Sequence, residues 1–220
     1  VVGQWVMVEH SVQWGGRAVR SKLTKFERRP LPPEDQAQRL ADISCVATIK
    51  RLALTGVIQC CLGREVKFES MTGGDPAAGT IGDLLSEVKL ENVDSPIERS
   101  FFQGTINLSK YLARDAVIDF CAMLLAVKDE HIERILNLEK DFPESTLRGI
   151  RDLPRFRKLC VSAPRKHYPD LFHLWTAEHA GCEFFLTMDK KFVNFGTNQC
   201  TGILKCEPVR PSMFLERIGV

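Results

Sequence analysis

Short runs of apolar residues alternate along the chain with longer segments in which apolar residues recur at helical spacing. The short runs cover residues 5–8, which lead directly into Glu9, and residues 57–61 and 183–186. They are too short for helices and are bounded by polar or turn-forming residues, which is typical of buried strands. Residues 202–207 predict a further strand at the edge of a sheet, closed by the proline that follows.

The longer segments predict helices with recognisable starts and stops. The first begins at Pro33, a residue that suits a first helical turn, and ends at Gly56. Apolar residues three or four positions apart predict further helices over residues 107–127, 130–140, 143–160 with an interruption at Pro154, 170–181 and 211–218.

The order of these elements predicts the fold class. A strand, a helix and a strand are followed by a long helical middle, and then by strand, helix, strand and helix, which indicates a parallel sheet flanked by helices. We expect one domain over residues 1–220, with residues 72–160 forming a helical insertion or subdomain within it.

The composition excludes several classes of protein. Of the 220 residues, 44% are hydrophobic and 26% are charged, which excludes a largely disordered chain. No apolar run approaches the roughly 18 residues that cross a bilayer. The first residues also lack the charged flank and long apolar core of a signal peptide. We therefore expect a cytoplasmic protein without a membrane partner.

Basic residues are concentrated near the N-terminus, although the net charge is only +2. Glu27 is the single acid in a segment that contains Arg17, Arg20, Lys22, Lys25, Arg28 and Arg29. Such a segment can form an arm that attracts phosphates, or an ordinary solvated loop, and both interpretations stay open.

Cysteine usage indicates reduced thiols rather than disulfides or zinc. The eight cysteines lie mostly within apolar segments, no CxxC occurs, and Cys200 and Cys206 are not at a zinc-binding spacing. Cys60 and Cys61 are neighbours in a predicted strand, and we expect both to be buried small hydrophobic residues.

Two carboxylates stand at the ends of predicted elements in the C-terminal part of the chain. Asp170 opens the helix predicted over residues 170–181, and Asp189 follows the strand predicted over residues 183–186. In open α/β sheets, ligands bind in the crevice outside the carboxyl ends of the strands, so an acid directly after a strand is in a functional location. The alternative is that both acids only stabilise helix N-termini.

This order of helix, glycine, apolar strand and Thr-x-Asp-Lys-x-Phe resembles the C-terminal half of PIN-domain nucleases. The resemblance implies a three-layer α/β/α fold, with a central parallel sheet and an inserted helical middle segment. It also implies a metal site of four acids, which match Glu9, Glu69, Asp170 and Asp189, with Glu65 as the competing assignment for Glu69. Glu9 departs from the family, which usually has the shorter Asp there, and this puts the geometry of that ligand in doubt.

The resemblance assigns supporting roles to three further residues. Thr187 stands two positions before the last acid, where its hydroxyl would orient a carboxylate or a metal-bound water. His173 lies one turn after Asp170 and would reach phosphate or the leaving group, and Lys190 would attract the RNA backbone.

The implied activity is that of a Mg²⁺- or Mn²⁺-dependent ribonuclease that hydrolyses RNA phosphodiester bonds, with single-stranded RNA as the expected partner. Many members of that family are toxins neutralised by an antitoxin, so an antitoxin or another protein is a further expected partner. A homodimer is also possible. Two alternatives remain: a PIN-like module that binds RNA or protein without cutting, and an α/β phosphohydrolase of small phosphate esters.

Overall fold

The computed structural model describes residues 3–14, 17–28, 33–67, 85, 87–99, 115–138, 140, 142–199 and 202–220. Within them the chain is mixed α/β, with one antiparallel strand pair, two short parallel pairs and a majority of helix. In the described part of the chain, no helix combines the length and apolar character that a membrane span requires.

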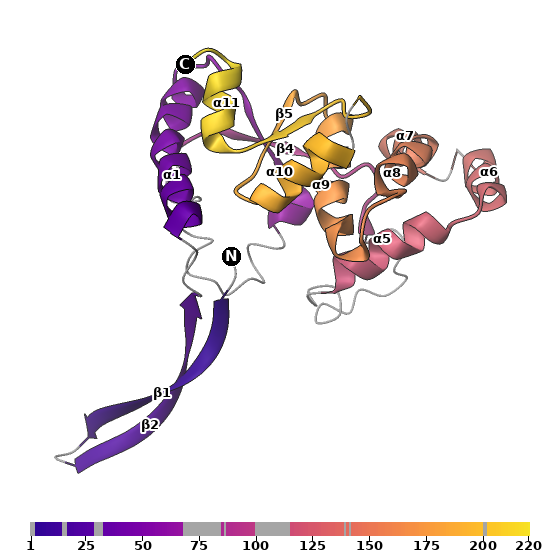
Figure 1. Ribbon diagram of the computed structural model, residues 1–220. Helices are drawn as coiled ribbons and strands as arrows, with labels where there is room; N and C mark the ends of the chain where they lie inside the picture. Colours follow the sequence, from indigo (N-terminus) through magenta and orange to yellow (C-terminus); the bar gives the residue numbers. More distant parts are fainter. Residues whose placement is uncertain are drawn as a thin grey trace.

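The N-terminal strands form a long antiparallel hairpin. β1 (Gly3–Trp14) pairs with β2 (Arg17–Arg28) along its whole length, and the ribbon extends away from the helices (Figure 1). The expectation that a buried central strand ends at Glu9 is therefore wrong. The strand continues because residues 10–14 keep alternating polar and apolar side chains and the Gly-Gly dipeptide that follows favours a hairpin. The basic segment is a strand, so its interpretation as a loop is also wrong.

A long helix and a short parallel strand pair follow the hairpin. α1 (Pro33–Leu54) has the predicted bounds to within two residues at its end. β3 (Cys60–Gly63) starts later than predicted and pairs in parallel with β4 (Leu90–Val93), a strand that the sequence pattern did not predict.

The cysteines that the structure describes are free thiols, which agrees with the prediction of reduced cysteines. Cys121 and Cys160 are buried, as expected. Cys60 is only half-buried and Cys61 is exposed, so the prediction that this pair fills the core is wrong. The short β3 strand has one covered face, and neighbouring residues in a strand point to opposite faces.

The helical middle contains four short helices in its described part. They are α5 (Ala116–Ala126), α6 (Asp129–Asn137), α7 (Glu144–Arg151) and α8 (Leu153–Cys160). The break between α7 and α8 falls at Asp152, just before Pro154, as the sequence predicted. β4 also lies within residues 72–160, so this segment is not wholly helical.

The C-terminal part contains a short 3₁₀ helix, η3 (Arg165–His167), and then α9 (Tyr168–His179), β5 (Phe184–Leu186), α10 (Lys190–Gln199), β6 (Glu207–Val209) and α11 (Pro211–Arg217). α9 ends two residues before Gly181, the predicted stop, whose φ of 75° suits the position just after a helix. β6 begins later than predicted because Gly202, with φ 75°, turns the chain first. Pro208 lies inside β6, where the described partner strand is β5 alone and an edge strand accepts a proline.

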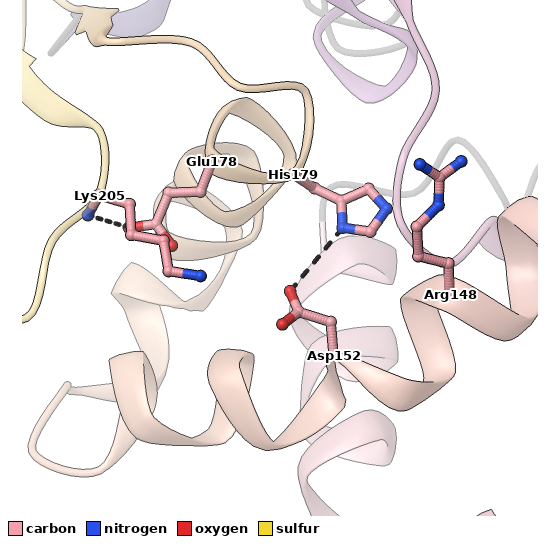
Figure 2. A pocket seen from close by; sticks show the side chains of 5 residues that line it. All are labelled: Arg148, Asp152, Glu178, His179 and Lys205. Carbon is pink, nitrogen blue, oxygen red and sulfur yellow. Dashed lines mark hydrogen bonds and ion pairs between the residues drawn. The ribbon is translucent and has the colours of Figure 1, made fainter.

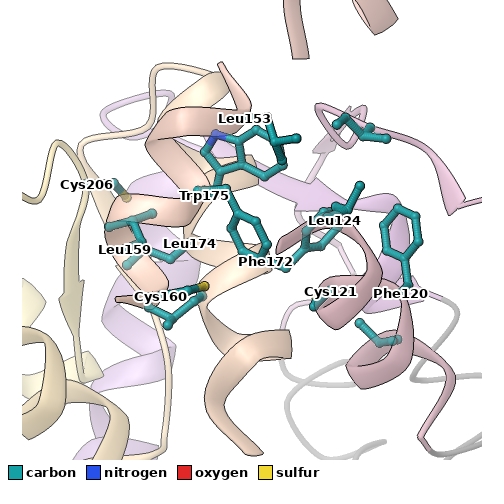
Figure 3. Packing of buried hydrophobic residues seen from close by; sticks show 14 of the residues in the cluster. Phe120, Cys121, Leu124, Leu153, Leu159, Cys160, Phe172, Leu174, Trp175 and Cys206 are labelled. Atoms are coloured by element: carbon teal, nitrogen blue, oxygen red, sulfur yellow. The ribbon is translucent and has the colours of Figure 1, made fainter. Parts of the chain in front are cut away.

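α9 lies at the centre of the main hydrophobic core. Phe172 and Trp175 of this helix are fully buried (Figure 3). Phe156 of α8 stacks on the indole with ring centroids 5.0 Å apart. A second, smaller core joins α1 to α11 through Ile49, Val209, Phe214 and Leu215. The described strands form separate pairs, and the parallel pairs with their helices confirm the mixed α/β class; the three-layer PIN-like arrangement stays a proposal.

Candidate acidic site

Asp170 occupies the first turn of α9, directly after Pro169, as the sequence predicted. Its Oδ2 lies 3.4 Å from Nδ1 of His167, and its side chain is 39% exposed. Burial raises the pKa of the Asp170 carboxyl, while the bond to His167 and the nearby His173 oppose this rise, and the charge of Asp189 adds to it. The carboxylate is therefore held in a site where its ionised form is disfavoured.

Asp189 lies between β5 and α10 and caps the helix. Its Oδ1 accepts hydrogen bonds from the backbone N–H groups of Lys191, at 2.8 Å, and Phe192, at 3.1 Å. The Oγ1 of Thr187 accepts the backbone N–H of Asp189 at 3.1 Å. Thr187 thus fixes the turn rather than the carboxylate itself. The capping role weighed from the sequence is confirmed, and Oδ2 of Asp189 takes no part in these bonds.

Asp170 and Asp189 each stand at the end of an element of the α9–β5–α10 unit, and the charge of Asp189 is one of the smaller causes that raise the pKa of Asp170. His167 links the two sides: it contacts Asp170 and stacks on Phe195 of α10, with ring centroids 5.6 Å apart. The sequence analysis missed His167, although its position three residues before Asp170 is the spacing at which side chains meet on a helix. His173 is buried, with 8% of its surface exposed.

Among the other acids proposed from the sequence, the described structure places Glu9 and Glu65 in the fold. Glu9 stands in the middle of β1, opposite Lys22, and not at the end of a central strand. Glu69 lies outside the described residues. Glu65, the competing assignment, is buried in an ion pair with Arg99 and is committed to that contact.

Lys190 also differs from its expected role. Its Nζ lies 3.0 Å from Oδ1 of Asp35, so it connects α10 to the start of α1. Lys191 is exposed and has no charged partner among the described residues, so it is the better placed cation for a phosphate backbone.

The carboxylate oxygens of Asp170 and Asp189 are the type of ligand that Mg²⁺ prefers. Over the residues described here, no group of three or more His, Cys, Asp and Glu is placed to hold a metal ion. Mg²⁺ often keeps several waters and binds through one or two carboxylates together with substrate phosphates. Asp170 and Asp189 each have one carboxylate oxygen outside their described hydrogen bonds, Oδ1 of Asp170 and Oδ2 of Asp189.

Comparisons with known proteins give no relative for this chain. No family model, no curated protein and no solved structure matches it.

Proposed function

We propose that this chain is a PIN-like, metal-dependent ribonuclease whose acidic site is centred on Asp170 and Asp189. The observation that carries the proposal is the placement of these two carboxylates at the ends of α9 and β5, where burial and, to a smaller extent, the charge of Asp189 raise the pKa of Asp170. A cation bound at Asp170 would offset this penalty on its ionised form.

Each residue of the proposed site has a separate role. The cap fixes Asp189 and leaves its Oδ2 as a ligand, while His167 holds the carboxylate of Asp170. A bound Mg²⁺ or Mn²⁺ would supply charge stabilisation for the phosphoryl oxygens. Lys191 attracts the RNA backbone, and Glu69 is the third acid of the proposal, on the family resemblance alone.

Cleavage of a 5′-labelled single-stranded RNA with Mn²⁺ or Mg²⁺ tests this proposal. Asp189→Asn is the informative variant, because Asn caps helices as well as Asp does and the turn is kept. We expect a loss of at least about a hundredfold in rate from removing this ligand. Asp119→Asn is the matched control, since it removes an exposed acid of α5 and should cut at the wild-type rate.

Three results contradict the proposal: equal cleavage by the Asp189→Asn variant, cleavage that survives a chelator, or activity confined to small phosphate esters. The position of Glu9 supports a second candidate, a module that binds RNA without cutting, because an acid in the middle of β1 is not at a strand end. RNA binding by the wild-type chain without metal-dependent cleavage would favour this candidate.

A further inference from the structure

A second polar site lies at the other end of α9. A pocket of about 280 Å³ is lined by five charged or titratable side chains, Arg148, Asp152, Glu178, His179 and Lys205 (Figure 2). They come from α7, the junction of α7 and α8, the last turn of α9 and the turn before β6. Elements far apart in the sequence thus converge on one small volume.

The pocket is separate from the acidic site. Asp170 and His179 are nine positions apart on α9, which corresponds to roughly 14 Å along the axis at about 1.5 Å per residue. The same separation is two and a half turns at about 3.6 residues per turn, so the two side chains leave the helix on opposite sides. A ligand of the pocket therefore does not depend on the proposed nuclease activity.

Asp152 holds the imidazole of His179 in place. Oδ2 of Asp152 accepts the indole Nε1–H of the buried Trp175 at 2.6 Å and lies 3.8 Å from Nδ1 of His179. The core thus fixes the carboxylate, and the carboxylate orients the ring (Figure 2). With Nδ1 turned toward Asp152, Nε2 is the nitrogen left for a ligand.

Glu178 is neutralised from outside the pocket. Its two oxygens accept both Nε, at 2.7 Å, and Nη2, at 2.6 Å, of Arg155, and Oε1 also accepts the backbone N–H of Lys205 at 2.8 Å. The guanidinium of Arg155 in turn donates to the carbonyl of Ile203. This carboxylate is therefore a fixed structural group with little charge to offer a ligand.

Two cations of the pocket are not neutralised by a neighbouring acid. Within the described residues, the side chains of Arg148 and Lys205 have no carboxylate partner. Both lie close enough to His179 to act on it: burial lowers the pKa of His179, Asp152 opposes this, and Arg148 and Lys205 lower the pKa further. With Arg155 included, three cations face two carboxylates, so the pocket favours an anion.

We propose that this pocket binds a phosphate group, with Arg148 and Lys205 holding its charge and Nε2 of His179 contacting one of its oxygens. A guanidinium and an ammonium on either side of an oriented imidazole match a tetrahedral oxyanion. The volume of about 280 Å³ is enough for a phosphate group and a small part of the molecule that carries it. Free phosphate and the 5′-phosphate of a nucleic acid share this chemistry.

Isothermal titration of the full chain with inorganic phosphate tests the proposal, and a 5′-phosphorylated dinucleotide in a second titration distinguishes the two sources. Arg148→Gln and Lys205→Gln should each weaken binding about tenfold, as expected for the loss of one charge-assisted hydrogen bond. Lys158→Gln, which removes an exposed cation of α8, is the matched control and should bind as the wild type does.

Sulfate isolates the contribution of His179, because its charge does not change near neutral pH. Sulfate affinity should rise as the pH falls through the pKa of His179, with Asp152, Glu178, Arg148 and Lys205 as the charges that face the ring. His179→Gln should remove this pH dependence and keep the fold. Absence of phosphate binding, equal weakening by the Lys158→Gln control, or a pH dependence that survives His179→Gln would each overturn the proposal.

Discussion

The buried ion pair between Glu65 and Arg99 is the contact whose loss should damage the fold most clearly. Nε and Nη2 of Arg99 donate to Oε2 of Glu65 at 2.9 and 2.7 Å, and each side chain is only 2% exposed. Glu65 follows β3 and Arg99 follows β4, so the pair joins the two chain segments that leave this parallel sheet. Its position makes it a test of whether the sheet is assembled as described.

The expected magnitude follows from the burial of both groups. Arg99→Met keeps a side chain of similar length and leaves Glu65 as an unpaired buried charge, which costs about 3–5 kcal/mol. A domain of ordinary stability has a free energy of unfolding of about 5–15 kcal/mol, so the variant loses between roughly a fifth and nearly all of its stability. The exposed pair of Arg165 and Asp119, with side chains 62% and 69% exposed, should contribute less than about 1 kcal/mol.

Urea unfolding at neutral pH measures the effect in a double-mutant cycle. We expect Glu65→Leu with Arg99→Met to be less destabilised than the sum of the two single variants, because the double variant contains no unpaired buried charge. Asp119→Asn is the control for removing an exposed pair. Additive single effects, or a loss in Arg99→Met as small as in the control, would refute the reasoning.

Three further variants or reagents test other parts of the structure. Burial raises the folded-state pKa of Asp170 above its unfolded value, so the stability this group contributes is present at low pH and lost as the pH rises. Asp170→Asn should therefore melt at a higher temperature than the wild type at pH 7, with the two curves converging near pH 3. Gly149→Ala should lose about 1–3 kcal/mol in urea unfolding, because a Cβ there would lie 1.7 Å from the carbonyl oxygen of Pro96. Iodoacetamide at pH 8 should alkylate the exposed Cys61 first. Burial raises the pKa of the Cys206 thiol to about 12, so mass spectrometry should find Cys206 modified only after unfolding.

Each of these predictions has a result that counts against it. Asp170→Asn melting below the wild type at pH 7 would mean that the carboxylate is stabilising. Gly63→Ala is the control for Gly149, since its nearest contact would be an ordinary 3.8 Å to Thr176, and equal losses would remove the packing argument. Rapid alkylation of Cys206 in the native protein would show that the turn before β6 opens.

The helices were largely predictable because their signals are local. Pro33 at a helix start, the break before Pro154 and the glycine after α9 act through backbone geometry that needs no partner. Apolar spacing located the helices, and within α9 Phe172 and Trp175 are fully buried.

The strands were less predictable, because a short apolar run does not show which partner it will pair with. Residues 5–8 fit a central strand as well as they fit a hairpin, and the alternation after Glu9 is what favours the hairpin. β4 was missed since its four residues, Leu90 to Val93, contain only two apolar positions. The predicted strand over residues 202–207 ends before Pro208, whereas β6 contains this proline, because an edge strand tolerates it.

For the acidic site, sequence position identified the ends of elements but not the contacts between them. Asp170 and Asp189 lie where the pattern predicted, because each is placed by the helix or strand beside it. The salt bridge that removes Glu65 from consideration depends on Arg99, 34 positions along the chain. His179 was overlooked for the same reason, since Asp152 reaches it only through the packing of α7, α8 and α9.

α9 explains why two polar sites coexist on so small a unit. The middle of the helix is buried, including its polar residues His173 and Thr176, and the half-buried polar side chains of the two sites lie at its two ends. At the first turn, Asp170 is the group whose charge is disfavoured; at the last turn, it is His179. The environment thus disfavours the charged form of the acid at one end and of the base at the other, and the two proposed ligands have opposite charge: a cation at Asp170 and an anion beside His179. A helix held this firmly by Phe156 and Trp175 keeps the two sites at a constant separation.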